Sequence, residues 1–227
     1  MALNFKVEDL PVASVDAHLP PVASDRLNAG HIVKRFRTPP QWLPEIAVER
    51  RFVERAAAQA AVLLPLVQRD ELTVLLTQRT DHLHDHPGQV SFPGGRVDPG
   101  DRDVVDTALR ESLEEIGLHS RHVQVIGQMP TYTTGSGFVV TPVVGLVEPD
   151  FTLALDAFEV ADVFEVPLSF LMTPAHHRWH RVEFGGVQRE FLSMPWDGPG
   201  NDGRQQRFFI WGATAAMLRN FYRFLSA

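Results

Sequence analysis

Cysteine is absent from this chain of 227 residues. The chain therefore has neither a disulfide framework nor a thiol nucleophile. It also lacks an apolar run approaching the roughly 18 residues that a membrane-spanning helix needs. Its N-terminus shows no basic stretch followed by an apolar core, which a secretory signal would have. We therefore expect no membrane partner and a cytoplasmic location.

An excess of positive charge is lacking as well. The formal net charge is −7 at pH 7, which argues against non-specific binding of nucleic acid. The length suits one or two domains and is enough to bury a full core. The composition thus favours an enzyme or binding module for a small molecule. Any acidic substrate would then be attracted by metal ions and local Arg or Lys.

Acidic side chains are concentrated instead in one short segment. Glu111, Glu114 and Glu115 fall within five residues, behind a Gly94-Gly95 pair. On a helix, residues three and four apart share a face, where like charges repel. A cation would compensate for this repulsion, and carboxylate oxygens are the ligands that Mg²⁺ and Mn²⁺ favour. The glycine pair predicts a loop in which the backbone approaches a ligand closely.

The surrounding residues support a helix. Asp101 or Asp103 can cap its start, and Gly117 suits the left-handed residue that ends it. Thr107 and the three glutamates are predicted on the polar side. The predicted buried stripe follows helical spacing through Val105, Ala108, Leu109, Ser112, Leu113 and Ile116.

The rest of the chain reads mainly as strands. Residues 78–100 are expected to form a loop, residues 213–225 a terminal helix, and Gly185-Gly186 a hairpin turn. The predicted strands are 58–67, 72–77, 123–129, 138–147, 163–166, 182–184 and 187–192. This order suggests a mixed sheet covered by helices. Residues 1–50 read as an extension, whose role as a cover, a homodimer contact or a substrate gate stays open.

The acidic segment resembles the signature of the Nudix hydrolases, G-x5-E-x7-R-E-U-x-E-E-x-G-U, where U is apolar. Two departures are visible. Ser112 replaces an apolar residue, and a longer spacer puts Arg102 where the isolated Glu belongs, with Asp101 or Asp98 available in its place. The matching positions are Arg110, Glu111, Glu114, Glu115, Gly117 and Leu118.

This resemblance implies a fold, a cofactor and catalytic residues. The fold would be the Nudix α/β/α sandwich with a mixed β-sheet, formed by residues 51–227. Glu111, Glu114 and Glu115 would bind Mg²⁺ or Mn²⁺, and Arg110 would pair with a signature carboxylate and orient it. The metal would activate water for attack on a diphosphate.

The preceding segment resembles the coenzyme A branch of the same family, whose motif is L-L-T-x-R-[S/A]-x3-R-x3-G-x3-F-P-G-G. Thr80 occupies the Ser/Ala position, and His84 stands where a permanently charged Arg is expected. The substrate would be coenzyme A or its acyl or oxidised derivatives, cleaved to 3′,5′-ADP and 4′-phosphopantetheine. The substrate-binding residues implied are Arg79, His84, Gly88, Phe92, Gly94 and Gly95.

Two later positions resemble functional residues of this branch. Ser136 lies in an S-G-F segment that would form a substrate loop, whose alternative is an ordinary hairpin loop. Glu159 begins an E-V-x-x-V-F segment and, like Glu114, is a candidate general base. We interpret His176, His177 and His180 as a polar strand start, because neighbours on an extended segment point to opposite faces.

Two other functions stay open. The first is hydrolysis of another nucleoside diphosphate derivative, such as ADP-ribose or a dinucleoside polyphosphate, which His84 favours and the intact upstream motif disfavours. The second is a non-catalytic module that senses a nucleotide. The complete set of acidic residues argues against the second.

Overall fold

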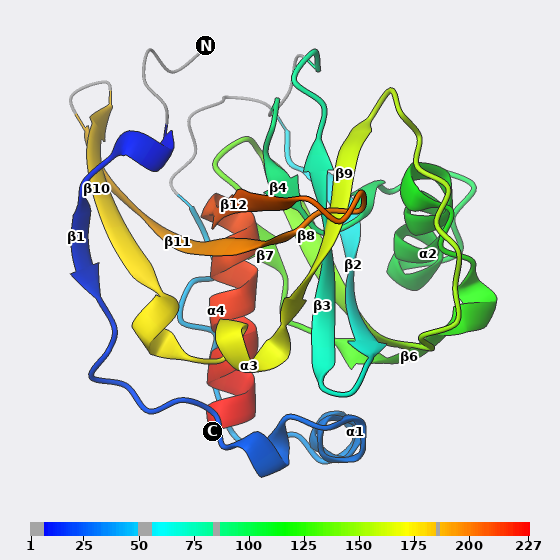
Figure 1. The fold of residues 1–227 in the computed structure, drawn as a ribbon, viewed down its shortest axis with the longest axis horizontal. Helices are drawn as coiled ribbons and strands as arrows, with labels where there is room; N and C mark the ends of the chain where they lie inside the picture. Colours follow the sequence, from blue (N-terminus) through cyan, green and yellow to red (C-terminus); the bar gives the residue numbers. More distant parts are fainter. Residues whose placement is uncertain (1–6, 50–55, 84–86, 185–186) are drawn as a thin grey trace.

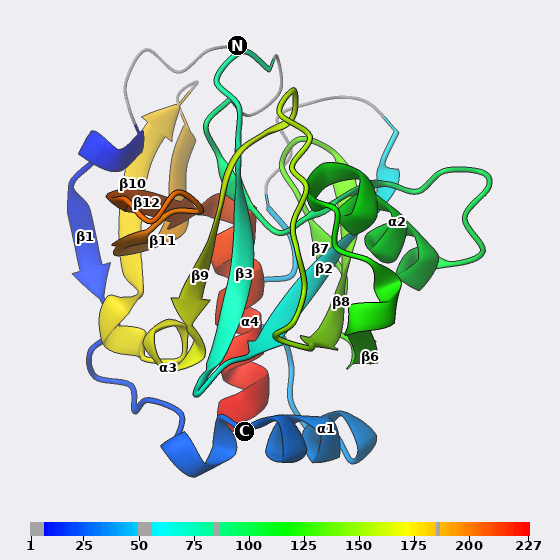
Figure 2. The ribbon, with the colours of Figure 1, turned by 45° about the vertical axis from the view of Figure 1, so that its right-hand side comes forward.

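Two helices enclose a mixed β-sheet in the computed structural model, with α4 on one face and α2 on the other (Figures 1 and 2). The structure describes residues 7–49, 56–83, 87–184 and 187–227. The chain thus has the predicted α/β/α layering with a mixed sheet. Its helices and strands are η1 Val7–Asp9, β1 Val12–Val15, η2 Ser24–Arg26, α1 Ala29–Arg37, β2 Ala58–Gln68, β3 Leu72–Arg79, β4 Val90–Ser91, β5 Gly94–Arg96, α2 Val104–Ile116, η3 Ser120–His122, β6 Val123–Gln128, β7 Tyr132–Thr133, β8 Phe138–Val147, β9 Val160–Pro167, α3 Leu168–Leu171, η4 Pro174–His176, β10 Arg178–Phe184, β11 Val187–Pro199, β12 Gln205–Trp211 and α4 Gly212–Ser226.

The mixed sheet is built around β2 and β8. These two strands run parallel from Ala58 opposite Phe138 to Val67 opposite Val147. The order along the sheet is β4-β3-β2-β8-β6, while β5 pairs with β2, β7 with β8 and β9 with β3. The predicted loop over residues 78–100 therefore contains two short strands, and β5 holds the glycine pair against β2.

The alternation of side chains along β2 separates two cores. Leu64 and Leu66 belong to the larger core, which includes the buried residues of α4. Leu63 and Val67 belong to the smaller core, which includes Ala108 and Ile116 of α2. Because successive strand residues point to opposite faces, one apolar strand serves both helices.

A second sheet lies on the α4 side of the molecule. Its order is β1-β10-β11-β12, and all its pairs are antiparallel. The predicted pairing of 182–184 with 187–192 is confirmed, since Phe184 lies opposite Val187. The Gly185-Gly186 turn itself lies outside the described residues. The sequence pattern missed β1, whose side chains are all exposed, and β12, whose first three side chains are exposed.

The N-terminal segment, residues 7–49, packs along α4 and the second sheet. The amide groups of Glu45 and Ile46 donate to the Asn220 side chain of α4, at 2.9 and 3.1 Å. Tyr222 donates to the carbonyl of Pro20 at 2.8 Å. Within the described residues, the longest apolar helices are too short or too polar to cross a bilayer.

Candidate active site

Two glycines place the backbone of β5 directly against α2. A side chain on Gly94 would lie 2.4 Å from the carbonyl oxygen of Ala61. A side chain on Gly95 would lie 2.5 Å from the carboxylate of Glu111. Because no Cβ atom fits at such distances, only glycine allows this approach. The predicted meeting of the glycine pair and an acidic helix is therefore present, although the pair lies in strand β5 and not in a loop.

Helix α2 begins and ends as its sequence predicts. The Asp103 side chain accepts from the amide groups of Val105 and Asp106, both at 2.9 Å. Gly117 ends the helix with φ 71°, in the left-handed conformation. Asp103 is thus the capping residue, which leaves Asp101 for another role.

The buried face of α2 differs from the predicted stripe. Leu113 is 41% exposed, while Thr107 is fully buried and Glu115 is only 6% exposed. The Ser112 hydroxyl is satisfied within the helix, since it donates to the carbonyl of Ala108 at 2.6 Å. The helix is therefore rotated so that the line Thr107, Glu111, Glu115 faces inward. Hydrophobic spacing could not reveal this rotation, because polar contacts determine it.

Glu115 is the most buried carboxylate of the site. One of its oxygens accepts from the amide of Gly94 at 3.1 Å, and the other lies 3.9 Å from the guanidinium of Arg79. Burial raises its pKa to about 8, and the nearby Glu111 and Glu159 add to the rise. Without a further cation, the group would be largely protonated at neutral pH.

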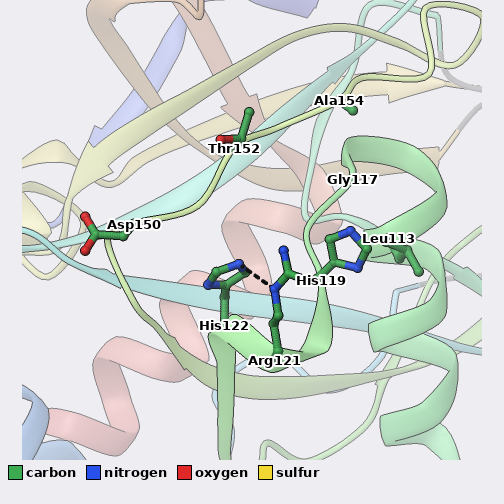
Figure 3. A pocket seen from close by; sticks show the side chains of 8 residues that line it. All are labelled: Leu113, Gly117, His119, Arg121, His122, Asp150, Thr152 and Ala154. Carbon is green, nitrogen blue, oxygen red and sulfur yellow. Dashed lines mark hydrogen bonds between the residues drawn. The ribbon is translucent and has the colours of Figure 1, made fainter.

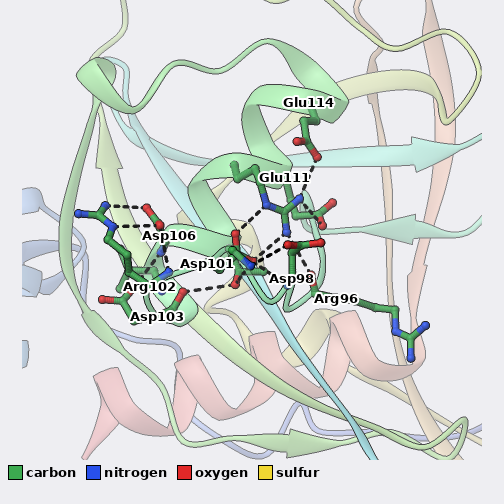
Figure 4. Close-up of polar contacts among 12 residues, drawn as sticks. Arg96, Asp98, Asp101, Arg102, Asp103, Asp106, Glu111 and Glu114 are labelled. Atoms are coloured by element: carbon green, nitrogen blue, oxygen red, sulfur yellow. Dashed lines mark hydrogen bonds and ion pairs between the residues drawn. The ribbon is translucent and has the colours of Figure 1, made fainter.

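Arg110 organises the remaining carboxylates (Figure 4). It donates to Glu111 and Glu114, each at 2.9 Å, and makes a two-pronged contact with Asp101 at 2.8 and 2.9 Å. The predicted pairing of Arg110 with signature carboxylates is thus present. The Arg110 contact holds the pKa of Asp101 well below its usual range. Asp98 makes no such contact, and Arg102 pairs with Asp106. Of the two aspartates that could stand in for the isolated Glu, Asp101 is therefore the one that contacts Arg110.

Glu159 joins the carboxylate cluster from the end of the loop before β9. It is partly buried and close enough to raise the pKa of both Glu111 and Glu115. Its backbone carbonyl accepts from the amide of Thr80 at 3.0 Å, which ties it to the end of β3. Glu165, the next glutamate along the chain, is instead paired with Arg69 at 2.7 Å.

The oxygen donors of this cluster suit a hard divalent cation. Burial raises the pKa of Glu111 as well as that of Glu115, so the site favours any ligand that compensates negative charge. In their present conformations, no three acidic or histidine side chains among the described residues enclose a metal position. Glu111 and Glu114 are instead both held by Arg110.

The upstream motif divides into buried and accessible residues. Phe92 is only 2% exposed and lies in the larger core, so it positions the glycine loop and does not face a ligand directly. Arg79 keeps 26% of its side chain exposed beside Glu115. Gly88 has φ 66°, which glycine adopts readily at a turn. His84 lies outside the described residues.

The predicted substrate loop connects β7 to β8. Ser136 is partly buried, and its hydroxyl lies 3.0 Å from that of Thr134. The Thr134 hydroxyl also accepts from the amide of Phe138 at 3.0 Å, which closes the loop. The Arg96 guanidinium, next to the glycine pair, lies 5.8 Å from the centre of the Phe138 ring. Ser136 therefore stands in a loop that adjoins the site.

Two other groups are separate from the carboxylate cluster. His177 and His180 are buried within their own hydrogen-bond networks, which corrects the expectation of a simple polar strand start. A hollow of about 500 Å³ lies beyond the C-terminal end of α2, between Leu113, Arg121 and Asp150 (Figure 3). None of the predicted site residues lines it.

The sequence of this chain is similar to a known family of proteins and to individual members of it. Residues 57–183 match the sequence model described as "NUDIX domain". A Yersinia enterocolitica protein named "Uncharacterized Nudix hydrolase NudL" is 45% identical over 161 residues, covering 70% of this chain and 77% of the relative. A protein of the same name from Salmonella newport is 38% identical over 198 residues, covering 86% and 94%.

Solved structures show weaker similarity. A Caenorhabditis elegans Ap4A hydrolase in a binary complex is 21% identical, with a TM-score of 0.43 over 52% of this chain and 86% of that one. A MutT/nudix family protein from Enterococcus faecalis is 15% identical, with a TM-score of 0.43 over 85% of this chain and 72% of that one.

Proposed function

Since this chain belongs to the Nudix hydrolase family, we propose that it hydrolyses the diphosphate bond of coenzyme A or its acyl or oxidised derivatives. The observation that carries the reaction type is the buried Glu115, which lies with Glu111 and Glu159 beside the Gly94-Gly95 pair of β5. The products would be 3′,5′-ADP and 4′-phosphopantetheine or its acyl form.

The substrate assignment rests on the segment between β3 and β5. Leu75, Leu76 and Thr77 of the coenzyme A motif lie buried in β3, and Phe92 anchors the following turn. This framework holds Arg79 beside the carboxylate cluster, where its permanent charge can bind a phosphate oxygen. By its position in the motif, His84 would contribute to binding of the same substrate a charge that depends on pH.

A bound Mg²⁺ or Mn²⁺ would neutralise diphosphate oxygens and lower the pKa of a coordinated water. Glu111 and Glu115, with Glu114, are the residues that would hold it. Arg110 positions Glu111 and Glu114 through its contacts with both. Asp101 in turn holds Arg110 in place.

We assign the general base to Glu159 in preference to Glu114. The Glu114 carboxylate is held by Arg110 at 2.9 Å on the exposed side of α2, whereas Glu115 is buried. Glu159 faces Glu111 and Glu115 and is placed by the backbone contact with Thr80. It can accept a proton from a water molecule near the cluster.

Product analysis tests the proposal most directly. We would incubate the protein with coenzyme A and Mg²⁺ and identify the products by mass, which reports the substrate and the cleaved bond together. Values of kcat/KM for coenzyme A, ADP-ribose and NADH would follow under identical conditions. If ADP-ribose or NADH exceeds coenzyme A by about a hundredfold, a difference of roughly 2.7 kcal/mol in transition-state binding, the substrate assignment is wrong.

A further inference from the structure

A carboxylate of the N-terminal segment holds the loop that carries Ser136. One oxygen of Glu49 accepts from the Tyr132 hydroxyl at 2.5 Å, and the other accepts from the amide of Gly135 at 2.8 Å. The backbone is joined as well, because the amide of Glu49 donates to the carbonyl of Thr133 at 2.8 Å. The start and the middle of the short loop are therefore tied to one residue.

Neighbouring residues make this contact a small extension of the sheet. Val48 forms a parallel bridge with Thr133, whose amide donates to the carbonyl of Ala47 at 2.9 Å. Tyr132 is only 1% exposed, and burial together with the Glu49 charge raises the pKa of its phenol, so its hydroxyl stays a donor. The Glu49 carboxylate thus accepts from a buried, protonated phenol, while the Glu49 backbone is held by Thr133.

The loop held by Glu49 is connected to the signature residues through the sheet. Phe138 lies opposite Ala58 of β2, and two residues farther along the same strand Ala60 lies opposite Arg96. The carbonyl of Arg96 accepts from Arg110 at 3.1 Å. The loop and the residues that Arg110 contacts are therefore joined through adjacent strand pairs.

We propose that Glu49 is a positioning residue for substrate binding, acting through the loop of residues 133–137 and its Ser136. This inference rests on the proposed function, because it takes that loop as a substrate loop. It gives the N-terminal segment a part in the active site, although Glu49 precedes the matched NUDIX region at 57–183. Glu49 itself neither touches the substrate nor exchanges a proton with it.

The central experiment compares two replacements of Glu49. In Glu49→Ala the loop loses both side-chain contacts, and we expect KM for coenzyme A to rise about tenfold while kcat changes less than about threefold. In Glu49→Gln the amide oxygen can accept from Gly135 and the amide nitrogen can donate to the Tyr132 oxygen. Glutamine should therefore restore most of the loss.

A double-mutant cycle tests whether Glu49 acts through Ser136. If it does, Glu49→Ala combined with Ser136→Ala should raise KM little beyond the larger single effect, because both changes remove one arrangement. Glu148→Ala is the matched control, since Glu148 is an exposed glutamate just beyond the other end of β8. We expect the control to leave KM and kcat unchanged.

Three results would overturn the inference. Equal damage from Gln and Ala would show that the charge of Glu49 matters and that positioning does not. Fully additive effects of Glu49→Ala and Ser136→Ala would show that the two residues act independently. An unchanged KM in Glu49→Ala would show that the contact has no part in binding.

A measurement without substrate keeps this inference separate from the proposed function. Hydrogen exchange of the peptide covering residues 131–138 should become faster in Glu49→Ala than in the wild type and stay close to wild type in Glu49→Gln. Unchanged exchange would overturn the inference whatever the substrate is. If the wild type cleaves another nucleoside diphosphate derivative, the proposed substrate is wrong, and the kinetic comparison is made on that compound.

Discussion

Helices α4 and α2, which flank the mixed sheet, each bury one ionisable side chain. The two side chains differ in how well neighbouring groups compensate their charge. Arg219 of α4 is only 2% exposed and is fully compensated. It pairs with Asp16 at 3.0 Å and Glu45 at 2.9 Å, and it donates to His177 at 3.0 Å. A buried charge satisfied on every side is typical of a structural element.

Glu115 of α2 is almost as buried but poorly compensated. Its partners are one backbone amide at 3.1 Å and a guanidinium at 3.9 Å, while Glu111 and Glu159 oppose its ionisation. The contrast teaches that burial alone does not mark a functional charge. The charge whose environment is incomplete is the one that calls for a ligand.

Replacement of Glu115 should have the largest effect. Glu115→Gln removes the negative charge that a divalent cation would need, and we expect kcat to fall roughly a hundred- to ten-thousandfold. Stability should change little, because this carboxylate is already largely protonated in the free protein. Initial rates with Mg²⁺ and a thermal melt measure the two quantities. Retained activity would contradict the metal-binding role.

Replacement of Arg219 should reduce stability and leave activity unchanged, the reverse of the effect expected for Glu115. Arg219→Met leaves Asp16 and Glu45 without their buried partner, and we expect the free energy of unfolding to drop by about 3 kcal/mol. The kcat of the folded protein should be retained. Arg223→Ala is the control, because Arg223 also contacts Glu45 but is 42% exposed. Its cost in urea unfolding should be about 0.5 kcal/mol.

The pH dependence of stability tests the Arg219 network further. Burial lowers the pKa of His177 to about 4, and Arg219 contributes to this shift. The unfolded state therefore binds the proton more readily, so stability is lost as pH falls below about 6.5 towards 4. Between pH 7 and 5, wild type should lose about 2 kcal/mol more than His177→Gln, measured by urea unfolding. Parallel losses in both proteins would contradict this assignment.

The smallest effect is expected from replacing Asp101, which holds Arg110 in place. Asp101→Asn weakens the two-pronged contact with Arg110, which then holds Glu111 and Glu114 less firmly. Because Asp101 acts one contact away from the reacting groups, we expect kcat/KM to fall only roughly tenfold. Asp98→Asn is the control, since among the described residues the Asp98 side chain hydrogen-bonds only to the nearby backbone amide of Gly100. Equal effects of the two substitutions would contradict the assignment to Asp101.

Much of the fold could be predicted where the pattern is local and periodic. The β2–β3 hairpin, α2 with its caps, β6, β8 and α4 follow from short-range hydrophobic spacing and turn residues. The edge strands β1 and β12 were not predicted, because β1 is only four residues long with every side chain exposed, and the apolar end of β12 runs directly into α4. Their pairing depends on backbone hydrogen bonds to distant residues, which leave no periodic signal.

The site shows the same division. Glu111, Glu114 and Glu115 could be identified by their spacing, and Gly94 and Gly95 by their residue type. The rotation of α2 that exposes Leu113 and buries Glu115 was not predictable. It depends on the amide of Gly94, which comes from another strand.

The sequence by itself determined the family, the reaction class and the glycine loop beside an acidic helix, since all of these are encoded at short separations along the chain. Only the tertiary structure decided that Asp101 holds Arg110, that Glu159 joins the carboxylates, and that Glu49 holds the loop of Ser136. These contacts join residues of different structural elements, so residue spacing along the chain does not indicate them. Whether a buried charged group finds a partner is therefore decided only when the strands pair and the helices pack against them.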